Sequence, residues 1–226
     1  MHTPISLHLL SATIVAAITI SGHAAEPAPG LQRLLEGNAR YAAGDAEHPN
    51  QNASRRAELA EGQKPFAVVV SCSDSRVSPE ILLDQGLGDV FVVRLAGNIV
   101  NDDALGSIEF AVSNLGARSI LVVGHEKCGA VAAVVSGIKA GADDKKPTAP
   151  AGHLGGIISA IRPAAEATAK QPGDNVDNAV RENVRLIVSR LKTSSPVLAP
   201  MVESGALDVA GARYDLDDGK LEMITR

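Results

Sequence analysis

Short runs of apolar, β-favouring residues recur along the chain, and segments with helical spacing of their apolar positions separate the first three runs. Strands that alternate with helices form βαβ crossovers, which build a parallel sheet with helices packed on its faces. The last two runs flank an Asp-Asp-Gly turn, which predicts a closing hairpin. The five runs are residues 66–71, 89–94, 120–123, 207–214 and 221–224. The sequence therefore predicts an α/β fold with a central, mostly parallel sheet of four to five strands flanked by helices.

The composition fits one such domain. The 226 residues are enough for a single hydrophobic core, and no linker or repeat divides them. Hydrophobic residues make up 45% of the chain but aromatic residues only 2%, so Val, Ile, Leu and Ala must fill the core, as in buried parallel sheets. The net charge of −5 and the lack of basic clusters argue against a nucleic-acid-binding face.

Helices are expected between and around the strands. Their apolar positions recur at helical spacing, and several segments begin with turn or capping residues. The expected helices are residues 29–43, 53–61, 79–84, 102–115, 130–138, 154–170, 174–191 and 195–205. Pro163 lies inside one of them and predicts a kink or a break there.

The first residues predict an export signal. An apolar run of 12 residues, Leu9–Ile20, is too short to span a membrane comfortably, and small residues at Gly22 and Ala24 fit a signal-peptidase site. We expect residues 1–24 to be a cleaved signal peptide and residues 25–226 to be a single periplasmic domain without a stable membrane anchor. The leader carries no Lys or Arg before its apolar run, which leaves a buried N-terminal helix as the alternative.

Both cysteines and one histidine follow closely after predicted strands. Cys72 follows the 66–71 run, and the 120–123 run leads to His125 and Cys128. Parallel strands end at one edge of a sheet, where α/β sites form, and the H-x-x-C spacing is typical of half a zinc site. The helix after Cys128 favours an anion at its start, so we expect this thiol to ionise readily. Three protein ligands with a fourth position for water predict a catalytic zinc centre, while a disulfide is the alternative in an exported protein.

An aspartate and an arginine beside Cys72 add a second element to the site. Arg76 can hold the Asp74 carboxylate bidentately, because guanidinium and carboxylate geometries match. With Asp74 held away, zinc keeps a water whose pKa falls to around 7, and Asp74 orients the resulting hydroxide. With Asp74 bound as a fourth ligand, the site is closed and inactive. A surface salt bridge of little consequence is the alternative interpretation of the pair.

Cys72-Ser-Asp-Ser-Arg76 together with His125-x-x-Cys128-Gly resembles the paired motifs of the β-class carbonic anhydrases. The segment from Gln85 to Asn98 looks like the family's stretch between these motifs, and the segment from Leu31 to Asn38 and the C-terminal tail also fit. The resemblance covers the chain from Leu31 to its end. It implies the same α/β fold and the reversible hydration of CO2 to bicarbonate and a proton by a zinc-bound hydroxide.

The resemblance also implies roles for single residues. The ligands of one Zn²⁺ per chain would be Cys72, His125 and Cys128. Asp74 and Arg76 would form a gating dyad, in which Asp74 binds the metal only in a closed state. Gln85, from a neighbouring subunit, and the Gly129 N–H would bind CO2 or bicarbonate. Because the family forms obligate dimers or assemblies of dimers, a homodimer or a dimer of dimers is expected.

Some bacterial members of the family close their site when bicarbonate binds, using a Trp shortly before the first Cys. The same switch uses an Arg at the end of the second strand and a Tyr. Here residues 67–70 are Ala-Val-Val-Val, Phe110 stands in place of the Tyr, and only Arg94 remains, so we expect no such switch and a site that is open at neutral pH. Three other functions stay as alternatives. They are hydrolysis of a CO2 analogue such as COS or CS2 at the same centre, a structural or storage zinc module, and dithiol redox chemistry, against which the lack of a C-x-x-C pair argues.

Overall fold

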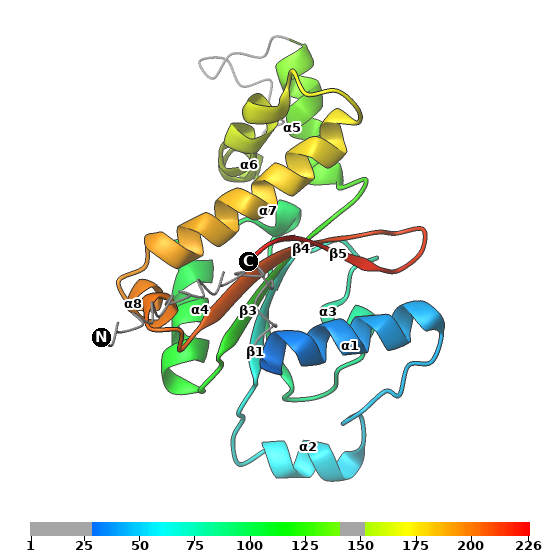
Figure 1. The fold of residues 1–226 in the computed structure, drawn as a ribbon, viewed down its shortest axis with the longest axis vertical. Helices are drawn as coiled ribbons and strands as arrows, with labels where there is room; N and C mark the ends of the chain where they lie inside the picture. The colour runs from blue at the N-terminus through cyan, green and yellow to red at the C-terminus, as the bar shows by residue number, and fades with distance from the viewer. Residues whose placement is uncertain (1–28, 141–151) are drawn as a thin grey trace, which may run out of the picture.

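Five strands form one sheet in the computed structural model, which describes residues 29–140 and 152–226. Their order is β2-β1-β3-β4-β5, and neighbouring strands are parallel except β4 and β5, which form an antiparallel hairpin (Figure 1). The strands are β1 (Ala67–Ser71), β2 (Val90–Arg94), β3 (Ser119–His125), β4 (Asp208–Tyr214) and β5 (Leu221–Thr225). The predicted α/β fold with a mostly parallel sheet is confirmed.

Helices form in all the predicted segments, with ends that differ slightly from those expected. They are α1 (Pro29–Ala43), α2 (Ala53–Leu59), α3 (Pro79–Leu82), α4 (Asp102–Asn114), α5 (Gly129–Lys139), α6 (Leu154–Thr168), α7 (Asn175–Thr193) and α8 (Leu198–Glu203), with a short 3-10 helix η1 (Ala96–Asn98). Asn or Asp side chains accept hydrogen bonds from the first turns of α2, α4 and α7, which satisfies N–H groups that lack a partner inside a helix. The helix α6 runs through Pro163, so a break there is wrong.

The side chains of the central strands point alternately into two apolar layers. Val69 and Leu121 lie in a cluster with α1, whereas Val70 and Val122 lie in a cluster with α4 and part of α7. Figure 1 shows α1 and α4 on opposite sides of the sheet, with α5 and α6 beyond its upper end. Both β1 and β3 are buried along their whole length, as strands covered on both faces must be.

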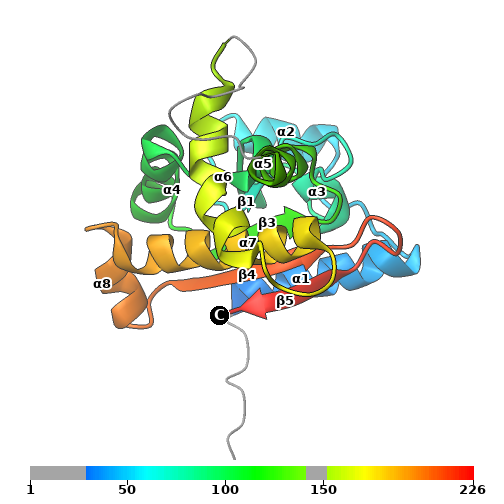
Figure 2. The ribbon, with the colours of Figure 1, turned by 90° about the horizontal axis from the view of Figure 1, so that it is seen from above.

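A buried asparagine ties α1 to the closing hairpin. Asn38 donates through Nδ2 to the Leu82 carbonyl at 3.0 Å and to the Gly219 carbonyl at 2.9 Å. Its Oδ1 accepts from the Leu221 N–H at 2.8 Å. The amide therefore uses both its N–H groups and its oxygen, and Figure 2 shows the resulting arrangement, with α1 beside β5.

The register of β1 against β3 determines where the chain leaves the sheet. Ser71 is the Cα partner of Val123, so Cys72 emerges beside Gly124, one residue before His125. Both strands point the same way, and their following residues therefore reach the same edge. The helix α5 begins at this edge, and η1 begins there after β2.

The predicted signal peptide, residues 1–24, lies outside the described residues. Within residues 29–140 and 152–226, no helix is long and apolar enough to cross a membrane. Export stays a prediction that rests on the sequence pattern of the leader.

The helix α7 lies close against β3 and β4, where two glycines face it. A Cβ at Gly124 would lie 2.7 Å from Val184 Cγ2, and a Cβ at Gly211 would lie 2.5 Å from Val184 Cγ1. Neither strand could carry a larger residue at these positions unless the helix or Val184 moved. The two glycines thus set the distance of α7 from the sheet.

Gly211→Ala is expected to lower the free energy of unfolding by about 1–3 kcal/mol, because the added methyl group would overlap Val184 in a packed core. Gly106→Ala is the matched control. Gly106 lies inside α4 with nothing within 4 Å of its would-be Cβ, so the same change should raise stability through helix propensity, by about 0.5–1 kcal/mol. Urea denaturation followed by circular dichroism measures both variants. A Gly211→Ala protein as stable as the wild type would contradict the close packing of α7.

Candidate metal centre

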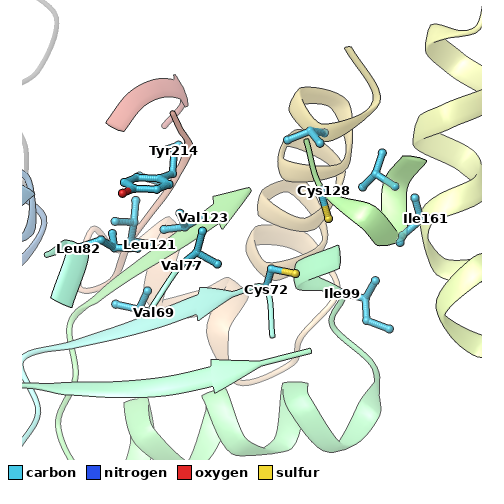
Figure 3. Packing of buried hydrophobic residues seen from close by; sticks show 14 of the residues in the cluster. Val69, Cys72, Val77, Leu82, Ile99, Leu121, Val123, Cys128, Ile161 and Tyr214 are labelled. Carbon is cyan, nitrogen blue, oxygen red and sulfur yellow. The ribbon is translucent and has the colours of Figure 1, made fainter. Parts of the chain in front are cut away.

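Two thiols and one imidazole converge at the C-terminal edge of the sheet, as the sequence predicts. Cys72 follows β1, His125 ends β3, and Cys128 is the N-cap of α5. Their ligand atoms all lie within 4.8 Å of one another, and all three residues are buried. Figure 3 shows the two sulfur atoms turned toward a common space, with Ile99 and Ile161 beside them. Both cysteines are free, so the alternative of a disulfide is wrong.

The histidine is held in one orientation. His125 is fully buried, and its Nδ1 lies 2.8 Å from the carbonyl oxygen of Glu126. A carbonyl can only accept, so Nδ1 carries the ring proton and Nε2 keeps a free lone pair. This Nε2 is buried and has no hydrogen-bond partner among the described residues. A buried lone pair without a partner is costly, and a metal ion bound beside the two thiols would supply that partner.

The two thiols differ in acidity. The pKa of Cys72 is lowered to about 3, chiefly because the Cys128 thiol donates a hydrogen bond to its sulfur. The backbone N–H groups of Asp74 and Gly97 also donate to that sulfur, at 3.4 and 3.3 Å. The shared hydrogen bond raises the pKa of Cys128, and burial raises it further. In the thiol pair by itself, the shared hydrogen bond and burial thus oppose the ready ionisation that the helix start favours for Cys128.

This set of donors fits Zn²⁺. Thiolate and neutral imidazole are ligands that zinc prefers, and three of them leave one tetrahedral position for water or substrate. The described part of the chain holds one more group of three candidate ligand residues, namely Glu126, Asp215 and Asp217. These carboxylates are paired with Arg213, Lys127 and backbone N–H groups, and Asp217 is exposed, so they form an ordinary ion-pair network.

Asp74 lies beside the centre and is held by Arg76. Arg76 Nε donates to Asp74 Oδ1 at 2.9 Å, and Arg76 Nη2 donates to Oδ2 at 2.7 Å, which is the expected bidentate arrangement. These hydrogen bonds hold the pKa of the Asp74 carboxyl well below its usual range. Asp74 Oδ2 lies 3.9 Å from His125 Nε2, close enough to face a group bound at the centre.

Arg94 supports the loop that carries Cys72 and Asp74, a role that the sequence did not reveal. Its Nε donates to the Cys72 carbonyl at 2.8 Å, and its Nη2 donates to the Asp74 carbonyl at 2.6 Å. One guanidinium at the end of β2 thus fixes two carbonyls of the neighbouring loop. The available signal was the position of Arg94 at the end of a strand, but no local pattern shows which way its side chain turns.

Gln85 is buried near α1 in the single chain. It is 1% exposed, and its Nε2 donates to the Leu83 carbonyl at 2.8 Å, near α1 and away from the metal centre of its own chain. Its Oε1 is buried and has no hydrogen-bond partner among the described residues. The role of Gln85 at the site of a partner subunit stays a prediction. Gly129 does begin α5 directly after Cys128, and a Cβ there would meet nothing within 4 Å.

Comparisons with known proteins agree with the fold and the site. A family model described as carbonic anhydrase matches residues 67–221. Carbonic anhydrase 2 of Mycobacterium tuberculosis is 40% identical over 194 residues, which cover 86% of this chain and 91% of that protein. The carbonic anhydrase of Mycolicibacterium smegmatis is 40% identical over 197 residues, which cover 87% of this chain and 93% of that protein.

Solved structures show the same architecture. A tetrameric β-carbonic anhydrase of the ascomycete Sordaria macrospora superposes with a TM-score of 0.65 at 25% identity, over 86% of this chain and 96% of that one. The Coccomyxa β-carbonic anhydrase in complex with acetazolamide gives 0.63 at 28% identity, over 86% of each chain. The fold and the family model define an α/β enzyme of the lyase class. The chain belongs to the β-class carbonic anhydrases, enzymes that hydrate CO2.

Arg94→Met is expected to weaken zinc binding by about 10- to 100-fold, because the loop that presents Cys72 loses both of its hydrogen bonds to the guanidinium. Arg118→Met is the matched control. Arg118 also donates to two backbone carbonyls, but it precedes β3, at the opposite end of that strand from His125. Competition with a chromogenic chelator measures zinc affinity in both proteins. Equal affinities would show that Arg94 does not support the centre.

Proposed function

We propose that this protein catalyses the reversible hydration of CO2 to bicarbonate and a proton with one Zn²⁺ per chain. Family membership supports the reaction. The metal is supported by one observation above all, the buried and unpartnered Nε2 of His125 beside two free thiols. Cys72, His125 and Cys128 would hold the ion. Bound Zn²⁺ supplies the Lewis acidity that makes hydroxide available near neutral pH.

Asp74 is suited to orient the attacking oxygen. Its carboxylate stays ionised at neutral pH because Arg76 lowers its pKa, so it accepts a hydrogen bond and donates none. By accepting the hydrogen of the attacking group, Asp74 turns a lone pair of that oxygen toward the carbon of CO2. Arg76 engages both carboxylate oxygens and so competes with the metal for them. We infer from this competition that the site is open at neutral pH.

The surroundings of the centre suit an apolar substrate and an anionic product. Val77 is fully buried in the apolar cluster that contains both cysteines, and Leu95 packs against that cluster. Carbon dioxide carries no charge and no dipole, so such side chains admit it without loss of hydration. Gly129 stands in the first turn of α5, where the N–H groups have no carbonyl partner inside the helix and the helix dipole favours an anion such as bicarbonate.

We also propose a homodimer or a dimer of dimers, exported to the periplasm. The helix α2 has no buried residue in the single chain, and Ile81 and Leu87 are 59% and 48% exposed. Such surfaces are typical of an interface between subunits, and the Sordaria relative is described as tetrameric. Export rests on the leader pattern alone.

Stopped-flow measurement of CO2 hydration on zinc-analysed protein tests the proposal. We expect fast hydration with one zinc per chain, and loss of both zinc and activity in Cys128→Ser, because a serine hydroxyl is a poor zinc ligand. Bound zinc without hydration across neutral and alkaline pH would overturn the proposed reaction. Assays of COS and CS2 hydrolysis on the same sample would then identify an analogue as substrate.

Arg76→Gln is expected to retain zinc but to lower kcat by at least about tenfold, or about 1.4 kcal/mol in activation free energy. Without the guanidinium, the Asp74 carboxylate is free to turn to the metal and take the position that substrate water needs. Arg185→Gln breaks a comparable ion pair with Glu182 on the exposed face of α7 and should leave kcat unchanged. Metal analysis and stopped-flow kinetics on both variants separate binding from turnover. Full activity in Arg76→Gln would contradict the gating role.

A further inference from the structure

A buried asparagine on α7 hydrogen-bonds the backbone of η1, which in turn contacts the candidate metal ligand Cys72. Asn183 is 2% exposed, and its Nδ2 donates to the Gly97 carbonyl at 2.9 Å. The Gly97 N–H donates in turn to the Cys72 sulfur at 3.3 Å. Gly97 is therefore held through both of its backbone polar groups, one by α7 and the other by a candidate zinc ligand. The proposed reaction gives Asn183 no role.

The backbone of Gly97 is easily displaced if the asparagine releases it. Its φ of 68° lies in the left-handed region, which glycine adopts at little cost and leaves as readily. The Gly97 carbonyl is buried in its bond with Asn183, and without that donor it would lack a partner. A buried carbonyl without a partner is costly, so a backbone rotation that gives it a new hydrogen-bond donor lowers the free energy. Such a rotation would also turn the Gly97 N–H away from Cys72.

The position of Asn183 does not depend on the loop that it holds. The next residue, Val184, packs over Gly124 and Gly211, which sets the distance of α7 from the sheet. On the other side, Ile161 closes the space around Gly97, because a Cβ at Gly97 would lie 2.5 Å from Ile161 Cδ1. The amide of Asn183 is thus presented by a packed helix, and η1 adjusts to it.

We propose that Asn183 is a positioning residue for the metal centre, which holds Gly97 so that its N–H keeps the hydrogen bond to the Cys72 sulfur. The inference rests on the proposed function, because it takes Cys72 as a zinc ligand. An N–H···S hydrogen bond withdraws electron density from a thiolate, so the sulfur donates less to the metal, and the metal stays a stronger Lewis acid. Asn183 touches neither metal nor substrate, and its effect passes through Gly97.

The test compares Asn183→Leu and Asn183→Asp, which remove the donor at nearly constant size, in the full chain loaded with Co²⁺. The thiolate-to-cobalt charge-transfer band reports electron donation by the sulfurs. We expect this band to shift, because the sulfur donates more electron density without the N–H. We also expect metal release to a chromogenic chelator to become about tenfold faster in both variants, because Cys72 loses a hydrogen bond that fixes the position of its sulfur. Gly97→Ala should shift the band in the same way, because its Cβ would meet Ile161 and displace the same N–H.

Asn38→Leu is the matched control. Asn38 is also a buried asparagine that bonds distant carbonyls, but it joins α1 to Leu82 and Gly219 and not to the centre. It should lower stability and leave the band and the release rate unchanged. An unshifted band in Asn183→Asp and Gly97→Ala, or an equal shift in Asn38→Leu, would overturn the inference. A wild-type protein that binds neither Zn²⁺ nor Co²⁺ would instead overturn the proposed function, and the inference with it.

Discussion

The parallel pairing of β1 with β3 is the interaction on which the metal centre depends. Its register aligns Ser71 with Val123, so Cys72 and His125 leave the sheet almost side by side. A slip of one residue would move Cys72 by about 3.3 Å along the strand and turn its side chain to the opposite face. Because both strands are buried along their whole length, apolar packing on both faces opposes such a slip. The core thus sets the geometry of the ligands before any metal binds.

Ionised thiols and the neighbouring Asp74 carboxylate bring negative charge to a largely buried site. This charge favours the binding of a cation. Arg76 neutralises Asp74 through a bidentate pair, whereas the Cys72 sulfur is stabilised by the Cys128 thiol and by the backbone N–H groups of Asp74 and Gly97. The two sulfurs therefore share a proton, which lowers the pKa of one thiol and raises that of the other. Two adjacent buried thiolates are stable only with a cation between them. A divalent cation neutralises the two thiolates, so no other charged group near the centre has to change its protonation or position.

The strands, the helices and the ligand cluster could be predicted from the sequence because each is marked by a local sequence pattern. Apolar runs mark the strands, and Cys72, His125 and Cys128 follow those runs directly. Arg94 and Asn183 could not be assigned, because each bonds a carbonyl that the chain brings near only after folding.

Two expectations from the sequence could not take account of neighbours in space. The acidity of Cys128 was inferred from the helix dipole alone, and the second sulfur outweighs that effect. Gln85 was assigned by resemblance along the chain; in the single chain its Nε2 donates to the Leu83 carbonyl, and its role at a partner's site stays a prediction. Both depend on neighbours that no local pattern shows.

The helix α7 links the stability of the sheet to the geometry at the sulfur. Successive residues on a helix point about 100° apart, so Val184 can face the sheet while Asn183 faces η1. A buried amide costs free energy unless it is hydrogen-bonded, and an apolar residue of similar size would avoid that cost. The cost is offset here because the Gly97 carbonyl is buried as well and needs a donor. The same packing that stabilises the core therefore also directs a hydrogen bond at a metal ligand.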